Sequence, residues 1–149
     1  MKNISLPIRY GFVTGIVLIA YFLLLDLFGK STNPVYSFFN AAITAFGIYE
    51  VIYISKIKSP ATFTYVEGFK NGIITGFVAT VAFTIFFLVY ATEVNDMFVD
   101  QLLQTVKRNF DIDVGIVTFI VAIMGFATTV VSALTVMQLF KNSNNMLSK

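Results

Sequence analysis

Four long apolar segments dominate the pattern of hydrophobic and polar positions along the chain. Charged residues separate the segments, and only Asp26 and Glu50 interrupt them. An α-helix rises 1.5 Å per residue, so about 20 apolar residues cross the hydrocarbon core of a bilayer. The pattern therefore predicts an all-α integral membrane four-helix bundle that forms a single domain over residues 1–149. The predicted spans are 10–28, 34–55, 71–92 and 114–140.

The connection between the third and fourth segments, residues 93–113, carries its own apolar periodicity. Phe98, Leu102, Val106 and Phe110 recur every four residues, and polar side chains fill the opposite side. This spacing predicts an amphipathic outer helix between spans 3 and 4. We expect the helix to lie flat in the membrane interface, with its apolar stripe toward lipid or toward the ends of the long helices. The alternative is a lid or a partner-binding helix.

Composition supports membrane residence and removes most catalytic chemistry. Apolar residues make up 57% of the chain and charged residues 12%, against about 45–50% and about 25% in soluble proteins. The chain contains no cysteine, histidine or tryptophan. Disulfides, thiolate nucleophiles and histidine bases or metal ligands are therefore excluded. We expect no enzymatic activity, no cofactor and no metal.

The distribution of lysine and arginine predicts the orientation, because cytoplasmic loops carry an excess of these residues. The connections fall on two sides of the membrane, and the more basic side includes both termini. We therefore expect a multi-pass protein with both termini in the cytoplasm. The basic residues on that side are Lys2, Arg9, Lys56, Lys58, Lys70, Lys141 and Lys149, and those on the other side are Lys30, Lys107 and Arg108.

One stripe of polar and small residues runs along the second span. Ser37, Asn40, Thr44, Gly47 and Glu50 fall within an arc of about 140° at 100° per residue. We take Glu50, Asn40 and Thr44 as a candidate intramembrane polar site and expect Glu50 to point into the bundle. One interpretation makes Glu50 a binding site for a proton or cation. The favoured alternative places it near the cytoplasmic interface, where it reaches water.

Glycine pairs occur near the cytoplasmic ends of the first and third spans. Gly11 and Gly15 form one pair, and Gly72 and Gly76 form the other. Small residues at this spacing let helix backbones approach closely in a membrane. We therefore expect these glycines to lie at helix–helix contacts.

Local signals predict where individual helices begin and end. Pro34 suits the first turn of the second helix, and Thr64 with Glu67 matches a capping box that starts the third helix before the membrane. Asp26 and Lys30 stand four residues apart near the end of the first helix. This spacing predicts an ion pair in the headgroup region.

Three stretches resemble a known family. They are residues 9–15 (RYGFVTG), residues 64–72 (TYVEGFKNG) and residues 90–103 (YATEVNDMFVDQLL). With the four-span pattern, they make the chain similar to the bacterial four-helix membrane proteins catalogued as domain of unknown function 4199, found mainly in the Bacteroidetes. The resemblance implies residence in the bacterial inner membrane and supplies no activity.

Two classes of function remain compatible with these observations. The first is a non-enzymatic scaffold, regulatory or assembly component of the inner membrane. The second is a small oligomeric transporter or channel component that uses the polar stripe of the second span. The expected partners are the lipid bilayer and a second copy or another membrane protein, and no nucleic acid is expected.

Overall fold

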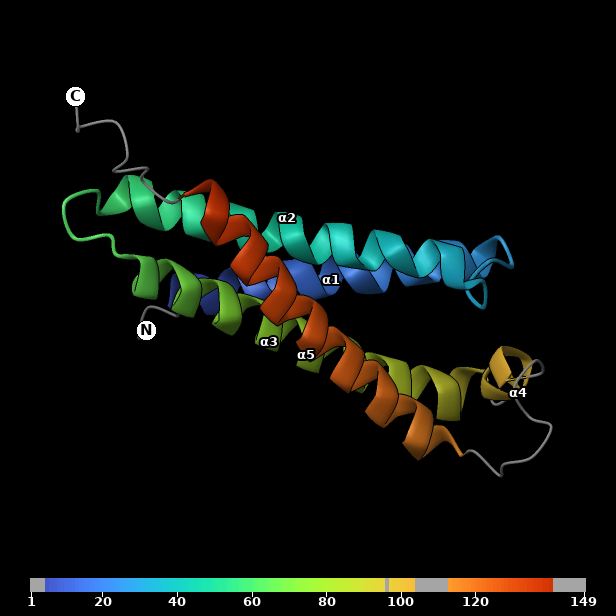
Figure 1. Ribbon diagram of the computed structural model, residues 1–149. Coiled ribbons are helices and arrows are strands. Elements are labelled where there is room, and N and C mark those ends of the chain that lie inside the picture. The colour runs from blue at the N-terminus through green and yellow to red at the C-terminus, as the bar shows by residue number, and fades with distance from the viewer. Residues whose placement is uncertain (1–4, 96, 104–112, 141–149) are drawn as a thin grey trace.

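The computed structural model describes residues 5–95, 97–103 and 113–140, and it is a bundle of helices (Figure 1). The prediction of an all-α four-helix bundle is confirmed, and no strand occurs in the described residues. Each of the four long helices is long and apolar enough to cross a membrane. The elements are α1 (Leu6–Leu27), α2 (Pro34–Lys58), α3 (Tyr65–Val89), the π-helical turn η1 (Tyr90–Val94), α4 (Phe98–Leu103) and α5 (Val114–Leu139).

Side-chain caps fix where three of the helices begin. The Asn33 side chain accepts a hydrogen bond from the second residue of α2 at 3.0 Å. The Thr64 hydroxyl accepts from the backbone N–H of Glu67 at 3.2 Å, so α3 begins at Tyr65, as the capping pattern predicts. Asp113 caps α5 in the same way, at 2.8 Å. Each cap satisfies a backbone N–H that has no partner within its helix.

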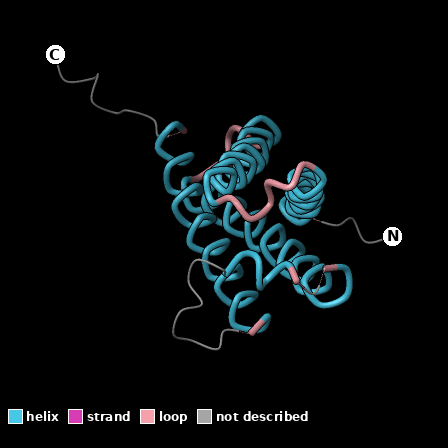
Figure 2. The backbone as a smooth tube through the Cα atoms, turned by 90° about the vertical axis from the view of Figure 1, so that its right-hand side faces the viewer, coloured by secondary structure: helices cyan, strands magenta, loops and turns pink. Residues whose placement is uncertain are grey.

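The bundle has two distinct ends. The start of α1 and the end of α5 lie together, because Leu6 and Phe140 pack against the same apolar cluster. We call this the termini end, and we call the opposite end, which carries the α1–α2 turn and α4, the α4 end (Figure 1). Seen from the α4 end, the four long helices are not parallel (Figure 2).

Helix α3 is the centre of the bundle and packs against α1, α2 and α5. Helices α2 and α5 also pack against each other, but they cross near the termini end and diverge toward the α4 end (Figure 1). The bundle is therefore closed on one side of the crossing and splayed on the other.

An apolar cluster fills the space between α2 and α5 at the termini end. It contains Ile48, Val51 and Ile52 of α2, which have no exposed surface, together with residues of α5. Those residues are Ala133, Val136 and Met137, all at most 6% exposed. We call these six residues the termini-end cluster.

Aromatic side chains form a second cluster at the α4 end. Phe22 of α1 lies at its centre, and five other rings meet its ring edge-to-face with centroids 5.1–6.3 Å away. Edge-to-face pairs of this kind are favourable beyond simple burial. The five partners are Phe83, Phe86, Phe87, Tyr90 and Phe98.

The outer helix packs on protein. Phe98 and Val99 of α4 are 2% and 4% exposed and pack into the aromatic cluster. Of the two surroundings expected for the apolar stripe, lipid and the ends of the long helices, these residues therefore have the second, because the diverging helix ends offer a protein surface. Val106 and Phe110, which extend the predicted stripe, lie outside the described residues.

The first glycine pair lies where α1 crosses α3. A methyl group added at Gly11 would lie 2.6 Å from the Cβ of Val78, and one added at Gly15 would lie 3.1 Å from the Cβ of Ala82. These separations leave no room for a side chain at Gly11 and very little at Gly15.

The second glycine pair lies where α3 meets α2 and α5. A methyl group at Gly72 would lie 3.1 Å from Cγ2 of Ile48, and one at Gly76 would overlap the side chain of Thr129. The structure thus places all four glycines at helix–helix contacts.

Candidate functional site

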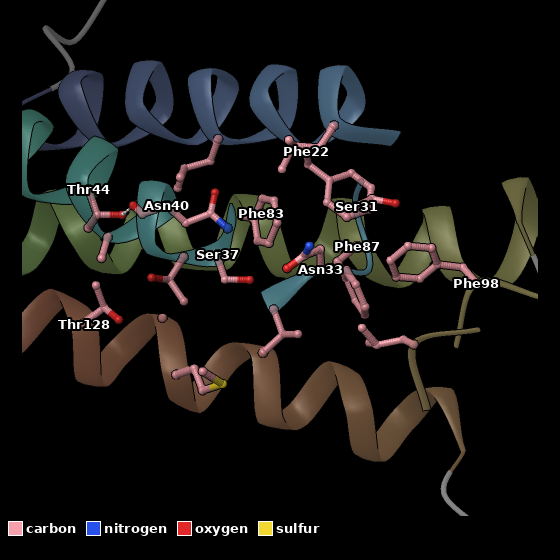
Figure 3. Close-up of a pocket in the computed structure, with 18 residues that line it drawn as sticks. Phe22, Ser31, Asn33, Ser37, Asn40, Thr44, Phe83, Phe87, Phe98 and Thr128 are labelled. Atoms are coloured by element: carbon pink, nitrogen blue, oxygen red, sulfur yellow. Dashed lines mark hydrogen bonds between the residues drawn. The ribbon is translucent and has the colours of Figure 1, made fainter. Parts of the chain in front are cut away.

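A cavity of about 220 Å³ occupies the splayed half of the bundle, between α2 and α5 (Figure 3). Helices α1 and α3 form its back wall, and Phe98 and Leu102 of α4 close it at the α4 end. Ser37 of α2 and Met124 of α5 line the cavity and are also exposed. The opening therefore lies between these two helices, on a side that would face the bilayer.

Apolar groups make up most of the walls. Phe22, Phe83, Phe87 and Phe98 contribute rings, and Leu18 continues the surface along α1. No charged side chain is among the described residues that line the cavity. The site can therefore solvate a neutral group far better than an ion, because an isolated charge in such surroundings is very costly.

Polar side chains gather at the deep end of the cavity. Asn40 and Thr44 come from α2, Thr80 comes from α3 and Thr128 comes from α5. The convergence of Asn40, Thr44 and Thr128 is visible in Figure 3. Thr44 lies about 15 Å along α2 from its first residue at 1.5 Å per residue, so these groups lie near the middle of the helix.

Most of these polar groups lack a partner in the described part of the chain. The Thr44 hydroxyl donates to the carbonyl oxygen of Asn40 at 2.9 Å. The Asn40 Oδ1 atom is buried and accepts no hydrogen bond. The hydroxyls of Thr80 and Thr128 form none with a described residue either, but these two hydroxyls are not fully buried. Buried polar atoms are nearly always hydrogen-bonded, so Asn40 Oδ1 is an exception.

No protein-family model, curated protein or solved structure matches this chain. The family resemblance seen in the sequence stays a prediction.

The structure brings Asn40 and Thr44 together but leaves Glu50 apart. Glu50 is half-buried, does not line the cavity, and lies about 9 Å along the helix from Thr44. It forms no hydrogen bond or ion pair with a described residue. Six residues turn a helix by about 600°, so Glu50 comes out on another side of α2. Its position fits a carboxylate that reaches interfacial water better than a member of the cavity.

Gly47 explains how the polar stripe of α2 divides. A methyl group at Gly47 would overlap the Thr14 side chain, so this part of the stripe packs tightly on α1. The polar stripe runs without a break along the surface of α2, but it does not face the same neighbour along its whole length. One part faces the cavity and another part forms a helix contact.

Asp26 joins three elements at the α4 end. Its Oδ2 accepts a hydrogen bond from the Tyr90 hydroxyl at 2.6 Å, and its Oδ1 accepts one from the Ser31 hydroxyl at 2.9 Å. The predicted Asp26–Lys30 ion pair is wrong. The Lys30 ammonium lies 5.5 Å from the centre of the Tyr36 ring instead, because the α1–α2 turn carries it away from α1.

The candidate polar site predicted from the sequence did not include Thr80 or Thr128. Thr80 does pack closely on Gly125 of α5. Both threonines line the cavity because α5 crosses α2 at an angle and leaves space on the α4 side of the crossing. The periodicity of one helix carries no signal for that angle.

Removal of the Tyr90 hydroxyl should weaken the α4 end. A hydrogen bond to a charged group contributes about 1.5–3 kcal/mol, and Tyr90 is only 4% exposed. We expect Tyr90→Phe to lower the free energy of unfolding in detergent by about that amount. Tyr49→Phe is the control, because the Tyr49 hydroxyl forms no hydrogen bond with a described residue. Equal stability of the two variants would contradict the role of the Asp26–Tyr90 contact.

Proposed function

We propose that this chain is a non-enzymatic, multi-pass protein of a bacterial inner membrane, with both termini in the cytoplasm, that acts as a regulatory or assembly component. It works by binding within the membrane, and a single copy conducts no ions. The four apolar helices and the family resemblance support the membrane, and the asymmetry of lysine and arginine supports the orientation.

The observation that carries the proposal is the termini-end cluster. Ile48, Val51 and Ile52 follow Thr44 on α2, and they meet Ala133 and Met137 of α5 with essentially no exposed surface. A path for ions needs polar groups or water along its whole length. This cluster interrupts any such path between the cavity and the termini end.

The surroundings of the two intramembrane carboxylates support the same proposal. Asp26 is engaged by Tyr90 and Ser31. Glu50 lies outside the cavity. Neither carboxylate lines the cavity, and both oxygens of Asp26 already accept hydrogen bonds from the hydroxyls of Tyr90 and Ser31. The proposal therefore includes no ion transport and no catalysis.

Ion flux in proteoliposomes tests the proposal. We expect vesicles containing the purified protein to show no flux above that of empty vesicles for protons or for a panel of monovalent cations. Glu50→Gln should leave this baseline unchanged. A flux that the parent supports and Glu50→Gln abolishes would contradict the proposal and favour a transporter.

A transporter is the second candidate, because the cavity contains polar groups and opens between α2 and α5. In that case the termini-end cluster would have to separate during the cycle. Truncation of the cluster by Ile52→Ala should then increase flux. Under our proposal, Ile52→Ala lowers stability and creates no flux.

The orientation predicts the behaviour of reporter fusions. A reporter after Lys149 should report the cytoplasm, and one inserted at Thr105 should report the opposite side. A reporter that is active in both compartments serves as the control for expression. A periplasmic signal from the Lys149 fusion would overturn the orientation.

A further inference from the structure

The polar groups at the deep end of the cavity need partners that the described chain does not supply. Asn40 Oδ1 is buried without a donor, and the hydroxyls of Thr80 and Thr128, which are not fully buried, form no hydrogen bond with a described residue. A buried polar group left unpaired costs about 1–3 kcal/mol. In a bilayer, water from the hydrocarbon side cannot relieve this cost.

Water alone is a poor occupant of this cavity. A volume of about 220 Å³ corresponds to roughly seven waters at about 30 Å³ each, and each buried water needs 2–4 polar partners. The rings of Phe22, Phe83 and Phe87 cover much of the wall and offer no such partners. Much of the wall suits an apolar chain, and polar side chains line the deep end and, with Ser31, Asn33 and Ser37, the part near the start of α2.

The charge of the walls limits the polar group to a neutral one. No Lys, Arg, Asp or Glu is among the described residues that line the cavity. The nearest cation along the chain is Lys30, which lies over the Tyr36 ring. A phosphate would therefore be buried without a counter-charge, at high cost. A hydroxyl fits, because it can accept a hydrogen bond from the Asn40 amide and donate to the hydroxyl of Thr80 or Thr128, whereas Asn40 Oδ1 is buried and is not reached from the cavity.

The size of the cavity and its opening indicate how the ligand enters. Pockets that enclose a drug-sized molecule have volumes of about 300–1,000 Å³, so this cavity encloses only part of a lipid. The opening lies between exposed Ser37 and Met124, on a side that would face the bilayer. The rest of an acyl chain can extend through that opening into the bilayer.

We propose that this cavity binds a neutral lipid with a free hydroxyl group, such as a diacylglycerol, which enters from the bilayer between α2 and α5. The hydroxyl pairs with the Asn40 side chain, and the adjoining carbons lie against the aromatic wall. The proposal rests on the membrane residence proposed above, but not on the absence of ion flux.

Tryptophan fluorescence provides a clean test, because the chain contains no tryptophan. Leu102→Trp places a reporter in the cavity wall, and Leu88→Trp places one on the exposed side of α3. Each variant is reconstituted in phosphatidylethanolamine vesicles with increasing fractions of brominated dioleoylglycerol, which quenches tryptophan on contact. We expect saturable quenching at residue 102, and quenching at residue 88 that only rises in proportion to the brominated fraction.

Two variants in the Leu102→Trp background identify the site. Asn40→Leu removes the amide with little change in volume, and Ala41→Phe fills the cavity that Ala41 lines. Both should abolish the saturable component. Ala42→Phe is the matched control, because Ala42 is exposed and does not line the cavity, so it should preserve saturation.

Two further lipids test the chemistry of the ligand. Brominated dioleoylglycerol methyl ether lacks the donor, and brominated phosphatidate adds a charge. We expect neither to give saturable quenching. Saturation with either lipid, or proportional quenching alone at residue 102, would overturn the proposal. Ion flux in the same vesicles tests the proposed function separately, so the two failures are distinguishable.

Discussion

The double variant Gly11→Leu, Gly76→Leu is expected to lose a large share of the stability of the bundle. A methyl group at Gly11 would already lie 2.6 Å from Val78, and one at Gly76 would overlap Thr129. Leucine at either position forces α3 away from α1 or from α5. Overpacking of a tight contact costs about 1–3 kcal/mol per site, and a whole domain is stable by only about 5–15 kcal/mol.

The two substitutions act on neighbouring residues of α3. A methyl group at Gly11 would lie 2.8 Å from the carbonyl oxygen of Thr75, the residue before Gly76, whereas Gly76 meets Thr129 of α5. Sites this close are coupled through α3, so the double variant is compared with both single variants and not with their sum. Unfolding in detergent, monitored by circular dichroism, provides the measurement. The control is Ala20→Leu with Ala127→Leu, because both alanines are exposed. Unchanged stability of the glycine double variant would contradict the observed packing.

The second large effect is expected for Phe22→Ala. Its ring contacts five other rings and is 7% exposed, and it also lines the cavity. Truncation of a buried phenylalanine typically costs about 3–5 kcal/mol, because the surrounding groups relax only partly. Phe98 would lose its main contact with α1, so α4 should detach from the bundle more readily.

Unfolding and proteolysis together check this prediction. Phe22→Ala should lower the free energy of unfolding and increase cleavage of the chain near α4. Phe12→Ala is the matched control on the same helix, since Phe12 is 54% exposed. If the Phe12 and Phe22 variants behave alike, the aromatic cluster does not hold the α4 end together.

The four helices were predictable because their signals are local. Charged residues delimit the apolar segments, and the side chains of Asn33 and Thr64 mark where α2 and α3 begin. Glycine spacing also indicated where helices come close, and the structure places Gly11 and Gly76 at such contacts. Each of these features depends on residues within one or two turns of a helix.

The cavity could not be predicted in the same way, because it depends on how α2 and α5 cross. Asn40 was identified from its place on α2, but its neighbours Thr80 and Thr128 come from two other helices. Glu50 shares the polar stripe with Asn40, yet it lies outside the cavity. The stripe spans a wide arc, and the position of α1 decides which part of it faces the cavity.

The destination of the α4 segment also depended on tertiary structure. An apolar stripe on a short helix can lie in lipid or on protein, and both satisfy the same periodicity. Divergence of the long helices leaves the rings of Phe22 and Phe87 uncovered, and Phe98 covers them. The apolar stripe could be predicted from the sequence, but the protein surface against which it packs could not.

Thiol labelling tests the central claim most directly. The claim is that the bundle is open on the α4 side of the α2–α5 crossing and sealed at the termini end. The chain contains no cysteine, so single cysteines report without background. Ser37→Cys and Val51→Cys lie on the same face of α2, one at the cavity opening and one in the termini-end cluster. In proteoliposomes, a membrane-permeant maleimide should label Ser37→Cys, which is exposed at the cavity opening, and should leave Val51→Cys unlabelled. Labelling of Val51→Cys in the folded protein would contradict a sealed termini end.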